Sequence, residues 1–242
     1  MRSKEWVLVK DGYYLARKEG VREMHIVNPP SEDVLRATYS QAYFEGTARS
    51  GYHHNVFAQK RKQIHKAQRK LQRIKRYVPA GGCILDVGCG PGFFVSEARK
   101  VGYVVEGCDI SSAAGEYAQK ELNLDIQVSD FLSLPFSFHS FEGITMFSVL
   151  EHALSPEENL QKAHSLLRDG GLLALSIPNA WGMTRYLKGV DWRGFSFPEH
   201  LHFWGRQEMT ELLEKNGFRD VQAPLKDNNF FRDTVYYYAW KR

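Results

Sequence analysis

A short apolar run near the middle of the chain ends in a glycine-rich turn that could hold a ligand. Residues 84–92 read Ile-Leu-Asp-Val-Gly-Cys-Gly-Pro-Gly, which places glycines at 88, 90 and 92. Glycine lets the backbone turn tightly and lets a ligand approach it closely. The dinucleotide pattern GxGxxG would need a glycine at position 93, which is Phe93, and the lysine of a phosphate-binding P-loop is absent. The turn therefore predicts a ligand site of another kind, at the end of a strand.

Four further motifs follow the turn in order along the chain. They are Gly107-Cys108-Asp109-Ile110-Ser111, Asp130-Phe131, Phe147-Ser148-Val149-Leu150-Glu151-His152, and the stretch from Leu167-Arg168-Asp169-Gly170-Gly171 to Ile177-Pro178-Asn179. With the glycine turn, they make the sequence resemble the class I S-adenosylmethionine-dependent methyltransferases over about residues 43–242, most strongly over 83–178. Residues 149–152 are similar to a signature of the subfamily that includes ubiquinone-biosynthesis O-methyltransferases and glycan-tailoring methyltransferases.

The resemblance implies S-adenosyl-L-methionine as the cofactor and S-adenosyl-L-homocysteine as its product. Asp109 matches the acidic residue that hydrogen-bonds the ribose hydroxyls in this family. A carboxylate suits two adjacent hydroxyls because it has two acceptor oxygens. The family's acidic residue at Asp130 accepts from the exocyclic amine of adenine. The cofactor-binding residues expected on this basis are Asp86, Gly88, Cys89, Gly90, Gly92, Asp109, Ile110, Asp130, Phe131 and Phe147.

Three histidines are the expected catalytic residues. Methyl transfer from a sulfonium is an in-line displacement that depends mainly on positioning, but a hydroxyl acceptor also needs a proton acceptor, and histidine suits that role. His152 follows the fourth strand of the resemblance, and His200 and His202 lie in a stretch similar to the family's P-x-H-L-x-F segment. A capping or packing role for His152, and a structural or surface role for His200 and His202, stay open.

No metal site is predicted. Glu151 beside His152 could hold a divalent ion, as the resemblance to quinone O-methyltransferases would allow, but two ligands are too few to establish a site. Many relatives carry a zinc ribbon with two CxxC pairs before the stretch matched here by residues 28–44. The three cysteines of this chain, Cys83, Cys89 and Cys108, lie elsewhere and show no such spacing. The N-terminal segment is therefore interpreted as a metal-free remnant.

Strands and helices that alternate along residues 83–242 must position these side chains. Apolar runs predict strands at 83–87, 103–108, 126–128, 143–149, 171–177 and 234–240, and helices at 91–101, 112–122, 156–167 and 207–216. Such alternation favours an α/β fold with a parallel sheet covered on both faces. The resemblance implies a Rossmann-like, doubly wound, seven-stranded, mostly parallel sheet, in which 234–240 is the antiparallel strand.

The chain is predicted to divide into an N-terminal extension at 1–54, a degenerate small β region, and a methyltransferase domain at 55–242. Runs at 6–9 and 13–16 around Asp11-Gly12 predict a hairpin. Asn28-Pro29-Pro30-Ser31 resembles the NPP(Y/F) motif of amine and amide methyltransferases, but position 31 is not aromatic and a fourth strand is predicted at 143–149. The segment is therefore interpreted as a turn into a helix that Ser31 caps.

Charge is divided unevenly along the chain. Residues 1–82 hold 17 Lys and Arg against 7 Asp and Glu, a net charge of +10, whereas residues 83–242 hold 15 against 21, a net charge of −6. Most of the excess lies in a predicted amphipathic helix at about 55–77, with an apolar stripe from Phe57 to Val78. Three roles are open for the basic helix 57–78: a solvated lid or flank, a surface for an anionic membrane or carrier-linked substrate, and nucleic-acid binding. The last is disfavoured because no recognisable nucleic-acid module accompanies the helix.

The expected acceptor is a small molecule, or a lipid- or glycan-linked group, and the atom expected to be methylated is a hydroxyl oxygen. N-methylation of an amine, RNA or protein, and a non-catalytic cofactor-binding protein, remain alternatives. Aromatic residues at 181–204 favour a substrate cap: Trp181, Tyr186, Trp192, Phe195, Phe197, Phe203 and Trp204. No apolar run is long enough to span a membrane, no secretory signal is recognisable, and the odd cysteine number fits a reduced compartment, so a cytoplasmic location is expected.

Overall fold

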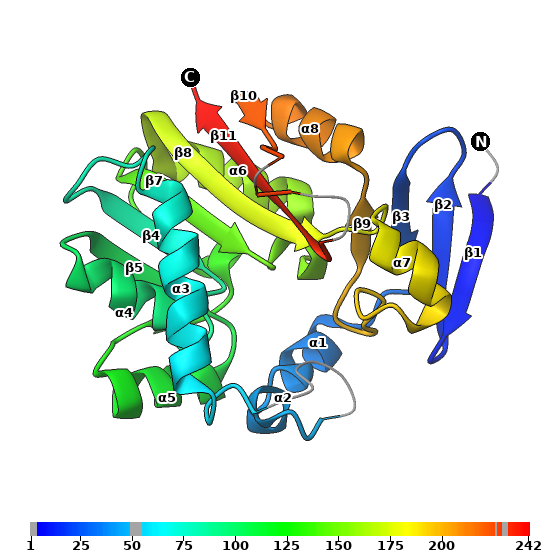
Figure 1. Ribbon diagram of the computed structural model, residues 1–242, viewed down its shortest axis with the longest axis horizontal. Coiled ribbons are helices and arrows are strands. Elements are labelled where there is room, and N and C mark those ends of the chain that lie inside the picture. Colours follow the sequence, from blue (N-terminus) through cyan, green and yellow to red (C-terminus); the bar gives the residue numbers. More distant parts are fainter. Residues whose placement is uncertain (1–3, 49–54, 226, 229–231) are drawn as a thin grey trace.

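The computed structural model describes residues 4–48, 55–225, 227–228 and 232–242, which form two sheets (Figure 1). The larger has the strand order β10-β11-β8-β7-β4-β5-β6. Strands β4 to β8 pair in parallel, whereas β11 is antiparallel to β8 and β10. The bounds are β4 Cys83–Val87, β5 Val104–Asp109, β6 Gln127–Val128, β7 Phe141–Phe147, β8 Leu167–Pro178, β10 Phe218–Gln222 and β11 Thr234–Lys241. The predicted seven-stranded, mostly parallel Rossmann-like sheet is confirmed, including its antiparallel strand.

The order of this sheet reverses at β4. From β4 the chain adds β5 and then β6 on one side, and it returns to the other side with β7 and β8. Helices α4 (Phe93–Lys100) and α5 (Ser112–Leu122) connect the first strands, and α6 (Pro156–Leu166) connects β7 to β8. In such sheets the ligand crevice opens beyond the carboxyl ends of the strands on either side of the reversal. The glycine turn follows β4 directly and therefore lies at this crevice.

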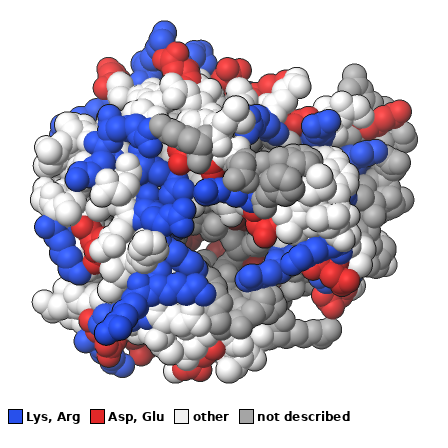
Figure 2. Space-filling model, in the orientation of Figure 1, with Lys and Arg blue, Asp and Glu red and all other residues white. Residues whose placement is uncertain are grey.

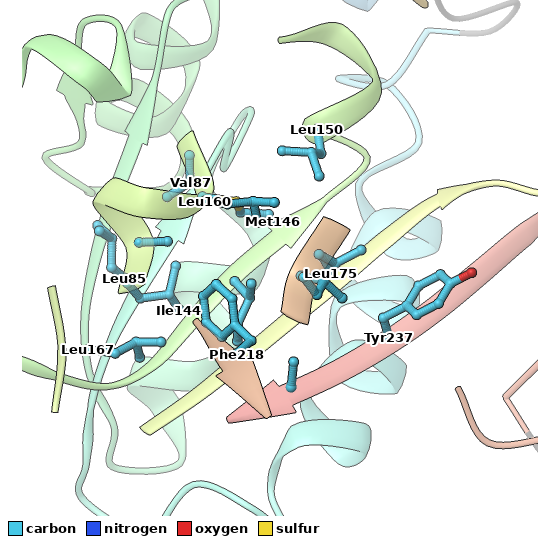
Figure 3. Packing of buried hydrophobic residues seen from close by; sticks show 14 of the residues in the cluster. Leu85, Val87, Ile144, Met146, Leu150, Leu160, Leu167, Leu175, Phe218 and Tyr237 are labelled. Carbon is cyan, nitrogen blue, oxygen red and sulfur yellow. The ribbon is translucent and has the colours of Figure 1, made fainter. Parts of the chain in front are cut away.

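Alternate residues of a strand face opposite sides of the sheet, so each central strand feeds two apolar cores. Leu85 belongs to the core under α6 and α8 (Arg206–Lys215), and its neighbour Ile84 belongs to the core under α3 (Lys60–Ile74), α4 and α5. Figure 3 shows part of the first core, in which the side chains of Leu85, Ile144 and Phe218 pack on one face of the sheet. Both faces of the sheet are therefore covered, which holds the carboxyl ends of the strands in fixed positions.

After residue 83, two strands were not predicted and one begins earlier than predicted. β10 has one buried side chain, Phe218, and only one other apolar residue, Val221, so this short edge strand has little apolar pattern to reveal it. β9 (His202–Trp204) has only three residues. β8 begins at Leu167, not at residue 171, because an irregularity lets Phe141 pair with Leu167 while Gly143 pairs with Leu172.

The basic helix, α3, packs on the sheet through its apolar stripe. Ala67, Leu71 and Ile74 are buried in the second core. The helix begins at Lys60, later than predicted, because residues 56–59 form a turn. Since the core uses the stripe, it is not available to lipid, and contact of the helix charges with an anionic membrane stays a prediction.

The N-terminal segment forms the smaller sheet, in the order β1-β2-β3-β9, where β1 is Lys4–Lys10, β2 Tyr13–Lys18 and β3 Glu23–Ile26. The predicted hairpin is confirmed by the antiparallel pairing of β1 with β2. β3 pairs with β9, which comes from the far end of the chain. Leu15 and Met24 share a third core with Trp192 and Phe203. Residues 13–35 thus share a core with residues 180–203, and a domain boundary at 54 stays a prediction.

Ser31 caps α1 (Glu32–Thr38), since its hydroxyl accepts a hydrogen bond from the backbone N–H of Val34. The Asn28 side chain accepts from the backbone N–H of Tyr14 at 2.8 Å and donates to the carbonyl of Gly12 at 3.0 Å. The predicted turn into a capped helix is confirmed, and Asn28 fastens it to the hairpin. A short helix, α2 (Gln41–Glu45), follows. In the described part of the chain, no helix has the length and apolar character needed to cross a membrane.

Candidate functional site

The glycine turn has a backbone that side chains would strain. Gly88, Gly90 and Gly92 all have positive φ, at 64°, 53° and 80°. A Cβ on Gly88 would lie 2.5 Å from the Cγ2 of Val149, so that position also needs the missing side chain. The turn is fixed to β5, because the backbone N–H of Cys89 donates to the carbonyl of Cys108 at 3.0 Å. The sequence thus builds a rigid, open backbone at the reversal of the strand order.

Asp109, at the end of β5, faces this turn. Its carboxylate accepts from the backbone N–H of Gly90 at 2.7 Å and from that of Ser111 at 2.9 Å. Burial raises the pKa of Asp109, against the effect of these backbone donors. A carboxylate has about four acceptor positions, and the backbone donors of Gly90, Ser111 and Ile110 leave it capacity for a ligand hydroxyl. The geometry fits the ribose-binding role that the resemblance implies.

Asp86 lies on β4, two residues before Gly88, and is 4% exposed. Its carboxylate accepts from the Thr145 hydroxyl on β7 at 2.5 Å. Burial raises the pKa of Asp86 to about 6, although Thr145 and the Lys70 ammonium favour the charged form. Lys70 reaches this region from α3, with its Nζ 4.7 Å from the centre of the Phe147 ring. Helix α3 therefore supplies a cation at the cofactor end of the site.

Asp130 and Phe131 complete the cofactor end. Asp130 caps the short 3-10 helix η1 (Phe131–Ser133), where its carboxylate accepts from the backbone N–H of Leu132 at 3.0 Å. Lys162 of α6 donates to three carbonyls of this segment, at Phe131, Leu132 and Leu134, over 2.6–2.9 Å. These contacts hold the segment against the sheet and keep Asp130 at its edge.

One cavity of about 760 Å³ joins these groups, a volume suited to a cofactor-sized ligand and more. Of the ten expected cofactor residues, nine line it: Asp86, Gly88, Cys89, Gly90, Asp109, Ile110, Asp130, Phe131 and Phe147. Gly92 does not line it. Gly92 instead precedes α4 and faces Leu124, whose Cδ1 would be 2.9 Å from an added Cβ. Its role is to let α4 start close to α5.

A histidine pair lies in the same cavity. The rings of His152, in the 3-10 helix η2 (Leu150–His152), and His200 meet edge to face, with centroids 4.6 Å apart. Nδ1 of His200 lies 2.7 Å from the carbonyl of Gly194. Since a carbonyl only accepts, Nδ1 carries the proton and Nε2 keeps its lone pair. Burial lowers the pKa of His200, and burial with His200 as neighbour lowers the pKa of His152 well below its usual range. Both rings are therefore neutral near pH 7.

Glu151 lies beside the pair and is 1% exposed. Burial raises its pKa to about 8, although Lys70 and the Ser148 hydroxyl favour the charged form. Glu151, His152 and His200 each offer one ligand atom, and these atoms lie within 4.8 Å of one another. This group could hold a divalent ion and leave a coordination position open. The prediction of a metal-free site stays a prediction.

His202 is not brought into the cavity. Its Nε2 lies 3.1 Å from the carbonyl of Ala153 and must donate to it. Its ring stacks on Trp204, with centroids 5.1 Å apart and planes at 12°. His202, the first residue of β9, thus holds the loop after η2, whereas His200, two positions earlier, lines the cavity. The two histidines look equivalent in the sequence, but only His202 belongs to β9, which pairs with β3, whereas His200 precedes the strand.

Among the cavity-lining residues that the sequence did not single out, four carry polar or charged groups used below: Tyr39, Lys66, Lys70 and Arg193. The spacing of Lys66 and Lys70, one helical turn apart, was visible but did not stand out among nine cations on the helix. Arg193 belongs to the aromatic stretch expected to form a substrate cap, and Trp192 and His200 of that stretch do line the cavity.

Comparisons with known proteins agree with this geometry. A family model described as a methyltransferase domain matches residues 52–223. A ubiquinone biosynthesis O-methyltransferase of Coxiella burnetii (strain Dugway 5J108-111) is 28% identical over 163 residues, covering 62% of this chain and 69% of the relative. A protein of Methanocaldococcus jannaschii named only as uncharacterized is 25% identical over 160 residues, covering 66% of this chain and 74% of the relative.

Solved structures share the fold. A methyltransferase of Thermotoga maritima superposes with a TM-score of 0.61 at 20% identity, over 78% of this chain and 95% of that one. The 1,6-didemethyltoxoflavin-N1-methyltransferase of Burkholderia thailandensis, solved with S-adenosylhomocysteine, gives 0.62 at 17% identity over 98% and 99%. The family match, covering most of the sequence and including the glycine turn, decides the assignment: this chain belongs to the methyltransferase domain family and is a class I S-adenosylmethionine-dependent methyltransferase.

Proposed function

We propose that the enzyme methylates a hydroxyl oxygen of a small-molecule acceptor, which can be free or linked to a lipid or glycan. The observation that carries the proposal is the neutral histidine pair His152–His200, which lines the same cavity as the glycine turn. A hydroxyl loses a proton when it is methylated, whereas a neutral amine can react before it loses one. A buried base with a free lone pair is therefore most useful for an oxygen acceptor.

His200 is the proposed proton acceptor. Its Nδ1–H donates to the carbonyl of Gly194, which fixes the ring and leaves Nε2 to take the proton of the hydroxyl. His152 positions that ring by edge-to-face contact, and Tyr39 holds His152 through a contact of 2.9 Å between its hydroxyl and Nδ1. The lowered pKa of each histidine keeps the pair unprotonated at neutral pH. The oxygen–carbon bond then forms as the carbon–sulfur bond breaks.

The proposed cofactor contacts use the other end of the cavity. When bound, S-adenosylmethionine supplies an electrophilic methyl group on its sulfonium. Asp109 would accept from the ribose hydroxyls, Asp130 from the adenine amine, and the backbone of the glycine turn would lie against the methionine part. The acceptor capacity left on Asp109 and the absence of a Cβ at Gly88 and Gly90 support this arrangement.

The relatives support oxygen as the acceptor atom. Several curated relatives carry the name ubiquinone biosynthesis O-methyltransferase, at 28–29% identity. Their acceptor belongs to those proteins. For this chain we propose only the shared reaction, a hydroxyl methylated with the help of a base.

A radiolabelled-cofactor assay tests the proposal. The protein is incubated with S-adenosylmethionine labelled on the methyl group and a panel of phenols, catechols and sugar alcohols, with matched amines beside them. We expect label in a hydroxyl compound, and a loss of kcat of about 100-fold in H200A, because general base catalysis contributes about that much. Labelling of amines alone, with H200A unimpaired, would overturn the oxygen assignment. Binding of S-adenosylhomocysteine without turnover of any acceptor would indicate a cofactor-binding protein instead.

A further inference from the structure

Two cations from distant parts of the chain lie at the cavity. Lys66, on α3, and Arg193, between the 3-10 helix η3 (Gly189–Asp191) and β9, both line it. Burial lowers the pKa of the Lys66 ammonium, and the charges of Lys62 and then Arg193 lower it further. In the part of the chain that the structure describes, neither cation has an ion-pair partner. Like charges held in one place repel, and an anion between them would remove the repulsion.

The segment that carries Arg193 is fixed. Trp192, before it, is 1% exposed, and its Nε1 donates to the Asp233 carboxylate at 2.9 Å. After it, a Cβ on Gly194 would fall 2.0 Å from the Trp192 ring, so the chain packs there without a side chain. The Lys10 ammonium donates to the carbonyl of Phe195 at 3.0 Å. Because the loop is already ordered, little conformational entropy is lost when Arg193 binds a ligand.

Helix α3 turns a selected row of its residues to the cavity. Gln63, Lys66, Ala67 and Lys70 line it, at the spacing of one helix face. Figure 2 shows Lys and Arg side chains gathered over α3, at the border of the hollow in the middle of this face. Arg61 belongs to the opposite side of the same helix and does not line the cavity. Helical periodicity therefore selects which cations reach the cavity, from a helix that carries Lys and Arg on most of its surface outside the apolar stripe.

We propose that the acceptor carries an anionic group, a phosphate or a carboxylate, that Lys66 and Arg193 bind while its hydroxyl lies at His200. This inference rests on the proposed function and narrows the acceptor to an anion. Arginine binds either group through two parallel hydrogen bonds, and lysine adds a point charge from another direction. Lys70 lies deeper, near Asp86 and Glu151, so its charge is assigned to the cofactor end.

Calorimetry with inorganic pyrophosphate and, separately, succinate tests the proposal on the protein saturated with S-adenosylhomocysteine. The wild type should bind at least one of them, and K66A and R193A should each weaken that binding about tenfold, the effect of a lost charge-assisted contact. The matched control is R61A, which removes the same charge from the opposite face of α3 and should leave the affinity unchanged. Absence of binding to the wild type, or an equal loss in R61A, would overturn the proposal.

The affinity for S-adenosylhomocysteine, measured on the same samples, separates this proposal from the function beneath it. If that affinity is retained and neither anion binds, the acceptor is uncharged and the methyltransferase proposal stands. If S-adenosylhomocysteine itself fails to bind, the proposed function fails first.

Vesicles of phosphatidylcholine with and without phosphatidic acid identify the source of the anion. If vesicles with phosphatidic acid compete with pyrophosphate for the wild type, and this competition is lost in K66A and R193A, the anion is a lipid headgroup. If the vesicles do not compete with pyrophosphate for the wild type, the anion belongs to a soluble acceptor. If R61A weakens vesicle binding as much as K66A does, and the soluble anions do not bind, the vesicles adsorb non-specifically. That result contradicts the proposed anion site at Lys66 and Arg193.

Discussion

The hydroxyl of Tyr39 lies 2.9 Å from Nδ1 of His152, a contact between residues 113 positions apart. Tyr39 follows α1, and its backbone carbonyl accepts from the Ser111 hydroxyl at 2.6 Å. Ser111 in turn donates its backbone N–H to Asp109. The N-terminal segment thus bridges the cofactor end of the cavity and the histidine pair, and it is part of the site.

Removing this hydroxyl should impair turnover more than cofactor binding. In Y39F the ring remains but His152 loses a hydrogen bond worth about 1 kcal/mol, which corresponds to roughly a fivefold change in rate if it is needed for positioning. We expect kcat to fall by about that factor, with the S-adenosylhomocysteine affinity unchanged. Y186F, at an exposed tyrosine, is the control and should match the wild type. A changed cofactor affinity with normal kcat would assign Tyr39 to the cofactor instead.

Mutation of His200 and of His202 should have opposite effects on kcat and on stability. His202 donates to the carbonyl of Ala153 and stacks on Trp204, so H202A should lower the free energy of unfolding by about 1–2 kcal/mol. Its kcat, measured well below the melting temperature, should stay near the wild-type value, whereas H200A should lose activity. H65A, at an exposed histidine on α3, serves as the control for both properties. Loss of kcat in H202A without loss of stability would restore it as a catalytic candidate.

Sequence reasoning predicted what local patterns determine. The glycine turn, Asp109 and Asp130 each follow an apolar run, and the carboxyl ends of parallel strands meet at one edge, so their convergence was predictable. The separation of His200 from His202 was not, because it depends on pairing of a three-residue strand with the distant β3. Arg193 and Tyr39 reach the cavity only through the third core, which joins residues far apart in the chain. Contacts of that kind leave no periodic trace in a single sequence.

Helix α3 should depend on one buried ion pair for its attachment to the sheet. The Arg73 guanidinium lies 3.0 Å from the Asp227 carboxylate, and both side chains are about nine-tenths buried. The Tyr238 hydroxyl also donates to Asp227, at 3.2 Å. Removing one member leaves the other charge buried without a partner, so R73A should lower the free energy of unfolding by about 3 kcal/mol.

Urea denaturation of R73A and of K120A checks this expectation. Lys120 pairs with Glu116 at 3.3 Å on the surface, and K120A should change stability by less than about 0.5 kcal/mol. The double variant R73M/D227L should regain part of the loss, since apolar side chains of similar size leave no unpaired charge. Equal effects in R73A and K120A would mean that the pair contributes nothing beyond a surface contact.

Asp86 should make the protein less stable as the pH rises. Burial raises its pKa from 3.8 to about 6, so the folded protein holds this proton more tightly than the unfolded chain does. The stability that comes from this proton is full below pH 3.8 and is lost as the pH rises through 6. A shift of roughly two pH units corresponds to about 3 kcal/mol.

D86N removes this titration while its side-chain oxygen can still accept from Thr145. The difference in unfolding free energy between D86N and the wild type should therefore increase between about pH 4 and pH 7 in favour of the variant, while other carboxyl groups cancel in the difference. D125N, at an exposed aspartate, should show no such trend. We also expect D86N to bind S-adenosylhomocysteine more weakly, because Asp86 lines the cofactor end of the cavity. A difference that does not change with pH would show that Asp86 is ionised normally.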